Sequence, residues 1–138
     1  MSLEQNKEIA LSVSRAVMNG DWEKVDELLD DSFLYVGDGA DPINKQQYIG
    51  FMRGVLCAAM TDMDMKFLRV IAEGDLVAIE YTNEMTHTGD FFKIPATGKR
   101  IVGTGQFIRE VKNGKVTAEW QTTNALGLMR QLGVIPKG

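Results

Sequence analysis

The sequence has little of several features that mark whole classes of proteins. Its 138 residues include one cysteine, one histidine and three prolines. A single cysteine, Cys57, cannot form a disulfide within the chain. One histidine and one cysteine cannot make up a zinc site either, so we expect no metal.

Long apolar runs and an excess of positive charge are also missing. No apolar run approaches the ~18 residues that a membrane-spanning helix needs, so we expect no membrane partner. Lys and Arg together number 15 against 19 for Asp and Glu, which gives a net charge of −4. Without a basic stripe to neutralise phosphates, we expect no nucleic-acid partner.

The chain has the length and composition of one globular domain. Hydrophobic residues make up 44% and charged residues 25% of it, which is ordinary for a folded domain. We find no internal repeat and no linker, so residues 1–138 are expected to form a single domain. The N-terminus lacks the order of charged, apolar and small residues of a signal peptide, which favours the cytoplasm.

The apolar pattern changes its period near Asp62. Before this point the spacing is helical, and after it alternation and turn signals dominate. Asp21 and the pair Asn44 and Gln47 are typical N-terminal caps, and Asn113-Gly114 predicts a hairpin. We expect helices at about residues 4–19, 21–30, 44–60 and 126–131, and strands at 32–36, 63–73, 76–87, 100–111 and 115–124. This order predicts an α+β fold, with three N-terminal helices on a strongly curved, mostly antiparallel sheet that encloses a pocket.

Alternation along the strands predicts which side chains face the pocket. In the strand that begins at Leu76 the apolar residues are odd-numbered, and His87 shares their face. Gly103 and Gly105 weaken their strand, which suggests a bend or a close approach, and Phe107 has the same parity. In the last strand the same reasoning turns the even residues inward, on condition that no bulge intervenes. Together with Tyr35 from the expected strand at residues 32–36, these strands predict the lining of the pocket. The expected lining residues are Tyr35, Met85, His87, Phe107, Trp120, Thr122 and Asn124.

Several segments resemble the SnoaL-like polyketide cyclases, also called ester cyclases, of the nuclear transport factor 2-like superfamily. They are similar to that family in the same order along nearly the whole chain: Asn19–Trp22 (NGDW), Ala72–Ala78 (AEGDLVA), Met85–Phe91 (MTHTGDF), Ile94–Lys99 (IPATGK), Asn113–Val116 (NGKV) and Leu126–Gly133 (LGLMRQLG). The resemblance implies an α+β cone whose interior binds the ligand, commonly as a homodimer. It also implies ring closure of a hydrophobic polyketide by intramolecular aldol condensation, without a cofactor.

The chain departs from the family's pattern at the residue that matters most for this reaction. The family carries an Asp four residues after the Trp of the last strand, where this chain has Asn124. An amide cannot accept a proton at neutral pH, so Asn124 could only donate a hydrogen bond to a ketone or enolate oxygen. Met85 likewise stands where the family has Gly.

Three hypotheses about the function follow. The first is a cyclase-like enzyme that binds a polyketide-, steroid- or ester-like molecule, with His87 and Asn124 at the reacting atoms. The second is an isomerase, dehydratase or hydrolase in which Asp38, placed where the similarly folded ketosteroid isomerases carry their base, moves the proton. The third is a non-catalytic, dimeric binding module. Burial of Asp38 and His87 at the pocket would favour an enzyme, whereas a solvent-facing or structurally bound side chain would favour the module.

Overall fold

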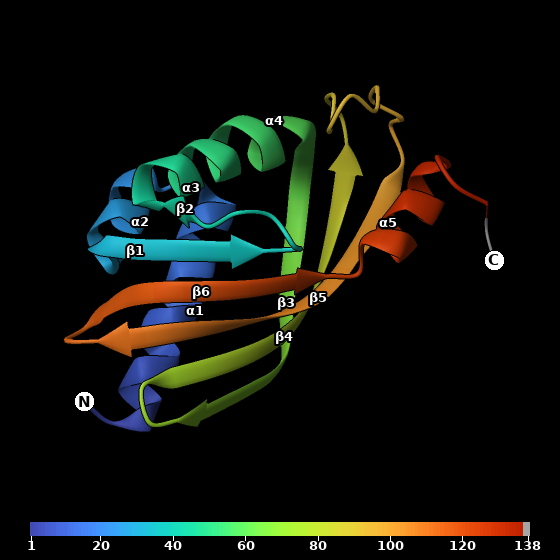
Figure 1. The fold of residues 1–138 in the computed structure, drawn as a ribbon. Helices are drawn as coiled ribbons and strands as arrows, with labels where there is room; N and C mark the ends of the chain where they lie inside the picture. Colours follow the sequence, from blue (N-terminus) through green and yellow to red (C-terminus); the bar gives the residue numbers. More distant parts are fainter. Residues whose placement is uncertain (137–138) are drawn as a thin grey trace.

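The N-terminal half of the protein is mainly helical, as predicted. The computed structural model describes residues 1–136, and Figure 1 shows its elements in order. The helical elements of this half are α1 (Leu3–Asn19), α2 (Trp22–Leu28), α3 (Lys45–Phe51), the π-helix η1 (Met52–Leu56) and α4 (Cys57–Ala59). The last three are continuous and cover residues 45–59 of the predicted helix at 44–60, whose last residue, Met60, begins the next strand instead.

Local capping signals place these helices. The Asp21 carboxylate accepts a hydrogen bond from the backbone N–H of Lys24 at 3.2 Å. Asn44 and Gln47 form the predicted capping box, each side chain accepting from the other residue's backbone N–H at 2.9 and 2.8 Å. Such caps satisfy N–H groups that have no partner within the helix, so both predicted starts are confirmed.

Six strands form one curved sheet in the order β2-β1-β6-β5-β4-β3. The strands are β1 (Leu29–Gly37), β2 (Ile43–Asn44), β3 (Met60–Glu73), β4 (Leu76–His87), β5 (Arg100–Lys112) and β6 (Lys115–Thr123), and α5 (Ala125–Leu132) follows. All neighbours are antiparallel except β1 and β6, which run parallel. The sequence pattern does not predict β2, because two residues are too few to show alternation.

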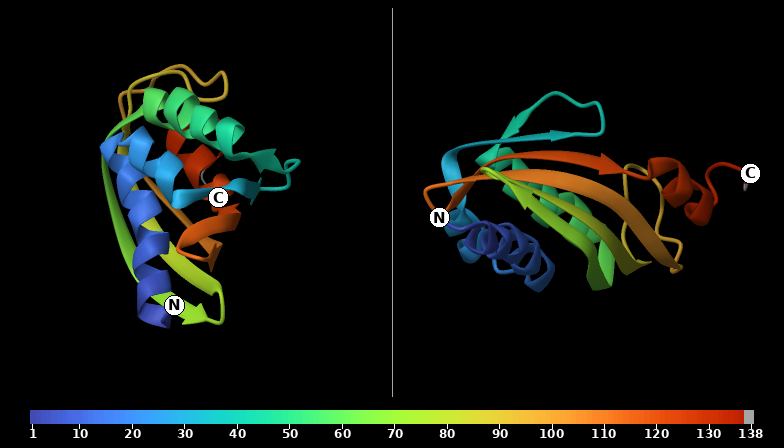
Figure 2. Two further views of the ribbon diagram at one scale, coloured as in Figure 1. Left: turned by 90° about the vertical axis from the view of Figure 1, so that its left-hand side faces the viewer. Right: turned by 90° about the horizontal axis from the view of Figure 1, so that it is seen from below.

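The helices cover the concave face of the sheet. Helix α1 packs across β3 to β6, while α3 contacts β1 and α4 contacts β3. Figures 1 and 2 show the sheet bending around this space without closing into a barrel. The main core lies between α1 and the sheet, where Val13, Val77 and Val116 are fully buried. The predicted α+β cone is therefore confirmed.

The predicted facing of side chains is right in two strands and wrong in the last. In β4 and β5 the odd-numbered residues face inward, as Ile79 and Phe107 do. In β6 the register shifts by one residue: Val116 pairs with Val111, but Ala118 pairs with Glu110, which leaves Thr117 as an extra residue. A bulge of this kind reverses the alternation of every residue beyond it.

The structure also bears on membrane association. Within residues 1–136, no helix combines the length and the apolar character that crossing a bilayer would demand.

Candidate functional site

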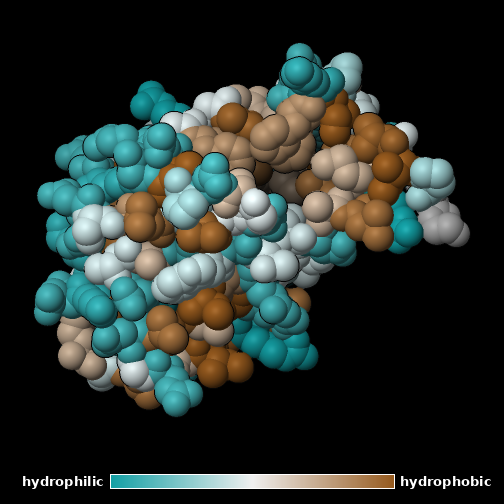
Figure 3. All heavy atoms as spheres, viewed as in Figure 1, coloured by the Kyte–Doolittle hydropathy of each residue, from teal (hydrophilic) through white to brown (hydrophobic). Residues whose placement is uncertain are grey.

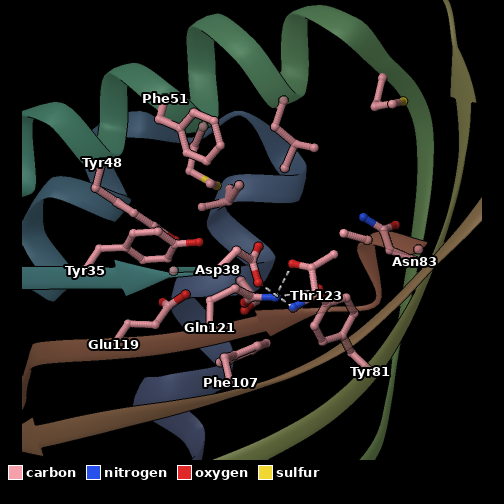
Figure 4. A pocket seen from close by; sticks show the side chains of 18 of the residues that line it. Tyr35, Asp38, Tyr48, Phe51, Tyr81, Asn83, Phe107, Glu119, Gln121 and Thr123 are labelled. Atoms are coloured by element: carbon pink, nitrogen blue, oxygen red, sulfur yellow. Dashed lines mark hydrogen bonds between the residues drawn. The ribbon is translucent and has the colours of Figure 1, made fainter. Parts of the chain in front are cut away.

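A cavity of about 480 Å³ lies between the concave face of the sheet and the helices. Figure 3 shows a hollow beneath the α3–α4 segment, bordered mostly by apolar residues, and Figure 4 shows its interior. The wall is mostly apolar, and it contains many methionine and aromatic side chains: Tyr35, Tyr48, Phe51, Met18, Met52, Met60, Met65, Met85, Met129, Tyr81, Phe91, Phe92 and Phe107. Unbranched methionine side chains adapt to irregular shapes, so this wall suits a bulky apolar guest.

One wall of the cavity is polar. Beyond the bulge at Thr117, the inward residues of β6 are Glu119, Gln121 and Thr123, and all three line the cavity. Gln121 Nε2 donates to the Tyr81 hydroxyl at 2.8 Å and lies 3.1 Å from Thr123 Oγ1. The strand therefore lays a row of hydrogen-bonding groups along an otherwise apolar hollow (Figure 4).

Asp38 lies on the cavity wall immediately after β1. Its Oδ1 accepts the backbone N–H of Thr123 at 2.7 Å, and its own N–H donates to the carbonyl of Gln121. Its φ of +49° is in the left-handed region, which few non-glycine residues adopt. Asp38 is exposed as a whole residue, so it borders the cavity while remaining open to solvent.

A buried ion pair lies at the part of the cavity nearest α1. Arg109 Nε donates to Glu119 Oε1 at 2.6 Å, and both side chains are 3% exposed. Arg109 Nη1 donates to the Ala10 carbonyl at 2.5 Å and to Ser14 Oγ at 2.7 Å. The guanidinium carbon lies 4.2 Å from the centre of the Phe107 ring. The pair thus joins β5, β6 and α1 while facing the cavity.

The three tyrosines of the cavity stay protonated. Burial raises the pKa of Tyr35 and of Tyr48 above the ordinary value, and the charge of Glu119 adds to both increases. Burial also raises the pKa of Tyr81, although hydrogen bonds to its hydroxyl oppose the change. Each phenol is therefore a neutral group that can donate a hydrogen bond to a guest.

His87 is fully buried, but it does not line the cavity. Its Nδ1 accepts the backbone N–H of Thr97 at 3.2 Å and lies 2.9 Å from Thr97 Oγ1. The ring thereby holds the loop between β4 and β5. The inward direction from β4 is as predicted, yet the expected projection of the imidazole into the pocket is wrong, because the ring packs against that loop.

The predicted place of Asn124 is also wrong. Asn124 is the N-cap of α5, and its Oδ1 accepts the backbone N–H of Gly127 at 3.0 Å. Trp120 and Thr122 fail to face the cavity for the reason already given, the bulge at Thr117; Trp120 is 42% exposed on the outer face. Thr122 and Asn124 border a separate shallow groove beside Leu68.

Three other predicted residues do lie on the cavity wall. Tyr35, Met85 and Phe107 line it together with Asp38. Sequence reasoning missed Arg109, Glu119 and Gln121. Arg109 has the same odd parity as Phe107, so the alternation of β5 could have found it. Nothing in the sequence signals the bulge that turns Glu119 and Gln121 inward.

Comparison with known proteins agrees with this architecture. The chain is similar to AclR from Streptomyces galilaeus (TM-score 0.89, 23% identity, covering 99% of this chain and 86% of that one). It is also similar to TsrD from Streptomyces laurentii (TM-score 0.86, 21% identity, 98% and 99% covered). An LEH-like epoxide hydrolase from M. tuberculosis has a TM-score of 0.75 at 18% identity, with 96% and 92% covered. At these identities the likeness shows the fold alone.

No curated protein matches the sequence of this chain. The model of one family, described as SnoaL-like polyketide cyclase, matches residues 7–132. This match spans α1 to α5 and includes every residue of the cavity wall. The chain therefore belongs to the SnoaL-like polyketide cyclase family.

Proposed function

We propose that the protein binds a largely hydrophobic small molecule in the cavity of its cone. The observation that carries this proposal is the cavity itself, about 480 Å³ and walled mainly by apolar side chains, many of them methionine or aromatic. Sites for small molecules have volumes of roughly 300–1,000 Å³, with an apolar wall and a few placed polar groups. The cavity of this protein has all three properties.

The polar wall narrows the class of guest. The Tyr81 hydroxyl accepts from Gln121, which leaves its own proton free for a carbonyl oxygen of the guest. Gln121 uses its amide N–H groups on Tyr81 and Thr123, which leaves its carbonyl oxygen as an acceptor. A polyketide-, steroid- or ester-like molecule, apolar with a few oxygen atoms, satisfies these groups.

A substitution that fills the cavity tests this proposal. Leu56 of η1 is half-buried and lines the cavity, so Leu56→Trp adds bulk where the guest would lie. Overpacking lowers the free energy of unfolding by about 1–3 kcal/mol. Because the indole occupies volume that the guest needs, we expect the affinity for the neutral probe N-phenyl-1-naphthylamine to fall about 10-fold or more. Fluorescence titration measures this affinity.

Leu3→Trp is the matched control for that substitution. Leu3 is exposed at the start of α1, so the same exchange there should leave the affinity unchanged. Equal affinities for wild type and Leu56→Trp, or no binding of the probe to wild type, would count against a ligand in this cavity.

A second candidate function is proton transfer by Asp38. Its Oδ1 is held by the N–H of Thr123, and among residues 1–136 no group donates to its Oδ2. The left-handed backbone at Asp38 is a costly conformation of the kind found at functional sites. Asp38 could remove a proton beside a carbonyl while Tyr81 donates to the resulting enolate oxygen. Isomerase, dehydratase or aldol chemistry could each begin with this step, whereas in a hydrolase the same carboxylate would take its proton from an attacking water.

The arrangement of the predicted catalytic groups weighs against an enzyme. Asp38 is exposed and structurally bound, and His87 holds a loop, which are the observations expected of a non-catalytic module. Asn124 caps α5, so its position does not support an aldol cyclase that relies on this side chain. Binding is therefore the function that the geometry supports best. Of the three predicted catalytic residues, Asp38 is the one that still supports a proposal of catalysis.

Proton exchange measures that catalysis without knowledge of the substrate. With 1-tetralone in D₂O, an active Asp38 should speed deuterium incorporation next to the carbonyl, followed by NMR. General bases contribute about 10²–10⁴-fold, so Asp38→Asn should lower the protein-dependent rate at least ~100-fold. Asp75→Asn, in the turn between β3 and β4, is the control that should retain the rate. Exchange no faster than in buffer would leave the binding module as the function.

We further propose that the outer face of the sheet forms a homodimer interface. Apolar side chains are exposed there at Leu34, Leu68, Val102, Ile108 and Trp120. Ile108 and Trp120 are direct cross-strand neighbours, so their side chains form one continuous patch. Patches of this kind commonly mark protein interfaces.

Light scattering after size-exclusion chromatography tests the dimer. Wild type should have twice the chain mass of 15.3 kDa. Trp120→Glu should shift the protein to the monomer mass, because it would bury a charge at the centre of the interface. Leu3→Glu on α1 should stay dimeric. A wild-type monomer at micromolar concentration would refute the interface.

A further inference from the structure

Glu119 has a carboxylate oxygen that the protein does not use. Its Oε1 accepts from Arg109 Nε at 2.6 Å, whereas no donor among residues 1–136 bonds Oε2. The side chain is only 3% exposed, yet the unpartnered Oε2 atom is not completely shielded. Since Glu119 lines the cavity, the remaining access to Oε2 is from the cavity.

The Arg109 side chain fixes this carboxylate rigidly. The guanidinium also donates to the Ala10 carbonyl and to Ser14 Oγ, and it lies over the Phe107 ring. Burial disfavours the charge of Arg109, but Glu119 and Tyr48 outweigh that effect and raise its pKa. The guanidinium therefore stays charged, balances Glu119 and cannot turn away from it.

The position of Glu119 in β6 determines which part of a guest can reach it. Alternate residues of a strand are about 7 Å apart, so Glu119 lies about that far from Gln121 along the polar wall. Asp38, which is exposed to solvent, is bonded to Thr123, one further step along this wall. A guest that enters past Asp38 and fills the cavity meets Glu119 with its leading end.

We propose that Glu119 Oε2 accepts a hydrogen bond from a hydroxyl group at the inner end of a neutral ligand. This inference rests on the proposed binding function and narrows its ligand to apolar alcohols or phenols. A carboxylate oxygen accepts but cannot donate, so an ether at this point loses the bond. An anionic guest, such as a fatty acid, would meet both Glu119 and Asp38 with like charge. Hydrogen bonds to charged groups are stronger than neutral ones, which makes the discrimination measurable.

Three probes of nearly equal shape test the proposal by isothermal titration calorimetry: 2-naphthol, 2-methoxynaphthalene and 2-naphthoate. For wild type we expect 2-naphthol to bind about 10-fold more tightly than the ether, because the hydrogen bond to the charged carboxylate outweighs the desolvation of the hydroxyl. We expect 2-naphthoate to bind most weakly. In Glu119→Gln, 2-naphthol should lose most of its advantage and 2-naphthoate should gain affinity.

The outcomes separate this inference from the function on which it rests. If none of the probes binds wild type, the binding function fails and the inference with it. If all three bind with equal affinity, or if Glu119→Gln keeps the wild-type preference, the inference alone is refuted. Glu84→Gln, on the outer face of β4, is the matched control and should keep the preference.

A second variant covers the case that Glu119→Gln does not fold, since it leaves Arg109 buried and unpaired. The double substitution Arg109→Met with Glu119→Leu removes both charges together, which buried pairs tolerate. In this variant the ether should bind at least as tightly as 2-naphthol. A retained preference for 2-naphthol would refute the role of Glu119.

Discussion

Replacing Arg109 with methionine should lower the free energy of unfolding by about 3–5 kcal/mol, because it leaves a buried charge without its partner. Glu119 would remain 3% exposed, with no guanidinium at 2.6 Å. The Ala10 carbonyl and Ser14 would lose their bonds to the same side chain, which ties α1 to the sheet. Urea denaturation followed by circular dichroism measures the loss.

The double variant Arg109→Met/Glu119→Leu decides how that loss arises. Replacing both members of a buried pair with apolar residues is often neutral, so most of the lost stability should return. A double-mutant cycle then gives a large coupling between positions 109 and 119. If Arg109→Met costs less than about 1 kcal/mol, as exposed pairs do, the pair is not buried as the structure has it.

Gly105→Ala should destabilise the protein by about 1–3 kcal/mol, the usual cost of overpacking. A Cβ atom on Gly105 would lie 2.6 Å from the carbonyl oxygen of Thr122 and 2.8 Å from the hydroxyl of Tyr81. The first contact is with backbone that pairs β5 to β6, so it cannot move freely. The second would displace the phenol that bonds Gln121, so binding of a probe in the cavity should weaken as well.

Gly103→Ala is the control on the same strand and the same face. There a Cβ would meet the terminal methyl of Met85 at 2.8 Å, the end of a flexible side chain that can turn aside. Glycine inside a strand costs about 0.5–1 kcal/mol relative to alanine, so this variant should be neutral or slightly more stable. Equal thermal unfolding for the two variants would contradict the close approach at Gly105.

Signals within a few residues of one another were sufficient for much of the fold. The cap at Asp21, the capping box at Asn44 and the hairpin at Asn113-Gly114 depend on local hydrogen bonds and backbone preference, and the structure has all three turns or caps. Long regular alternation placed Met85 and Phe107 correctly, because β4 and β5 pair without a bulge between Leu76 and Thr86.

The candidate site was harder to predict, because it depends on register. Thr117 has no partner in β5, and its hydroxyl instead donates to the Glu110 carboxylate at 2.7 Å. That single residue exchanges the inward and outward faces of β6, so Trp120 lies outside while Glu119 lies inside. Asn124 follows the strand and caps α5. The histidine was directed inward as expected, but only the packing of the loop at Thr97 decided what its ring would touch.

By itself, the sequence determined the order of helices and strands, the mixed fold and the apolar character of the interior, since periodicity and caps act over a single element. Tertiary structure alone decided which polar groups meet in the hollow. Arg109 and Glu119 are ten residues apart, and Arg109 also bonds Ala10 on α1, so this cluster depends on three elements packing together. The physical reason is that a bulge costs little locally but shifts the facing of every later side chain, and only the packed sheet shows where that shift falls.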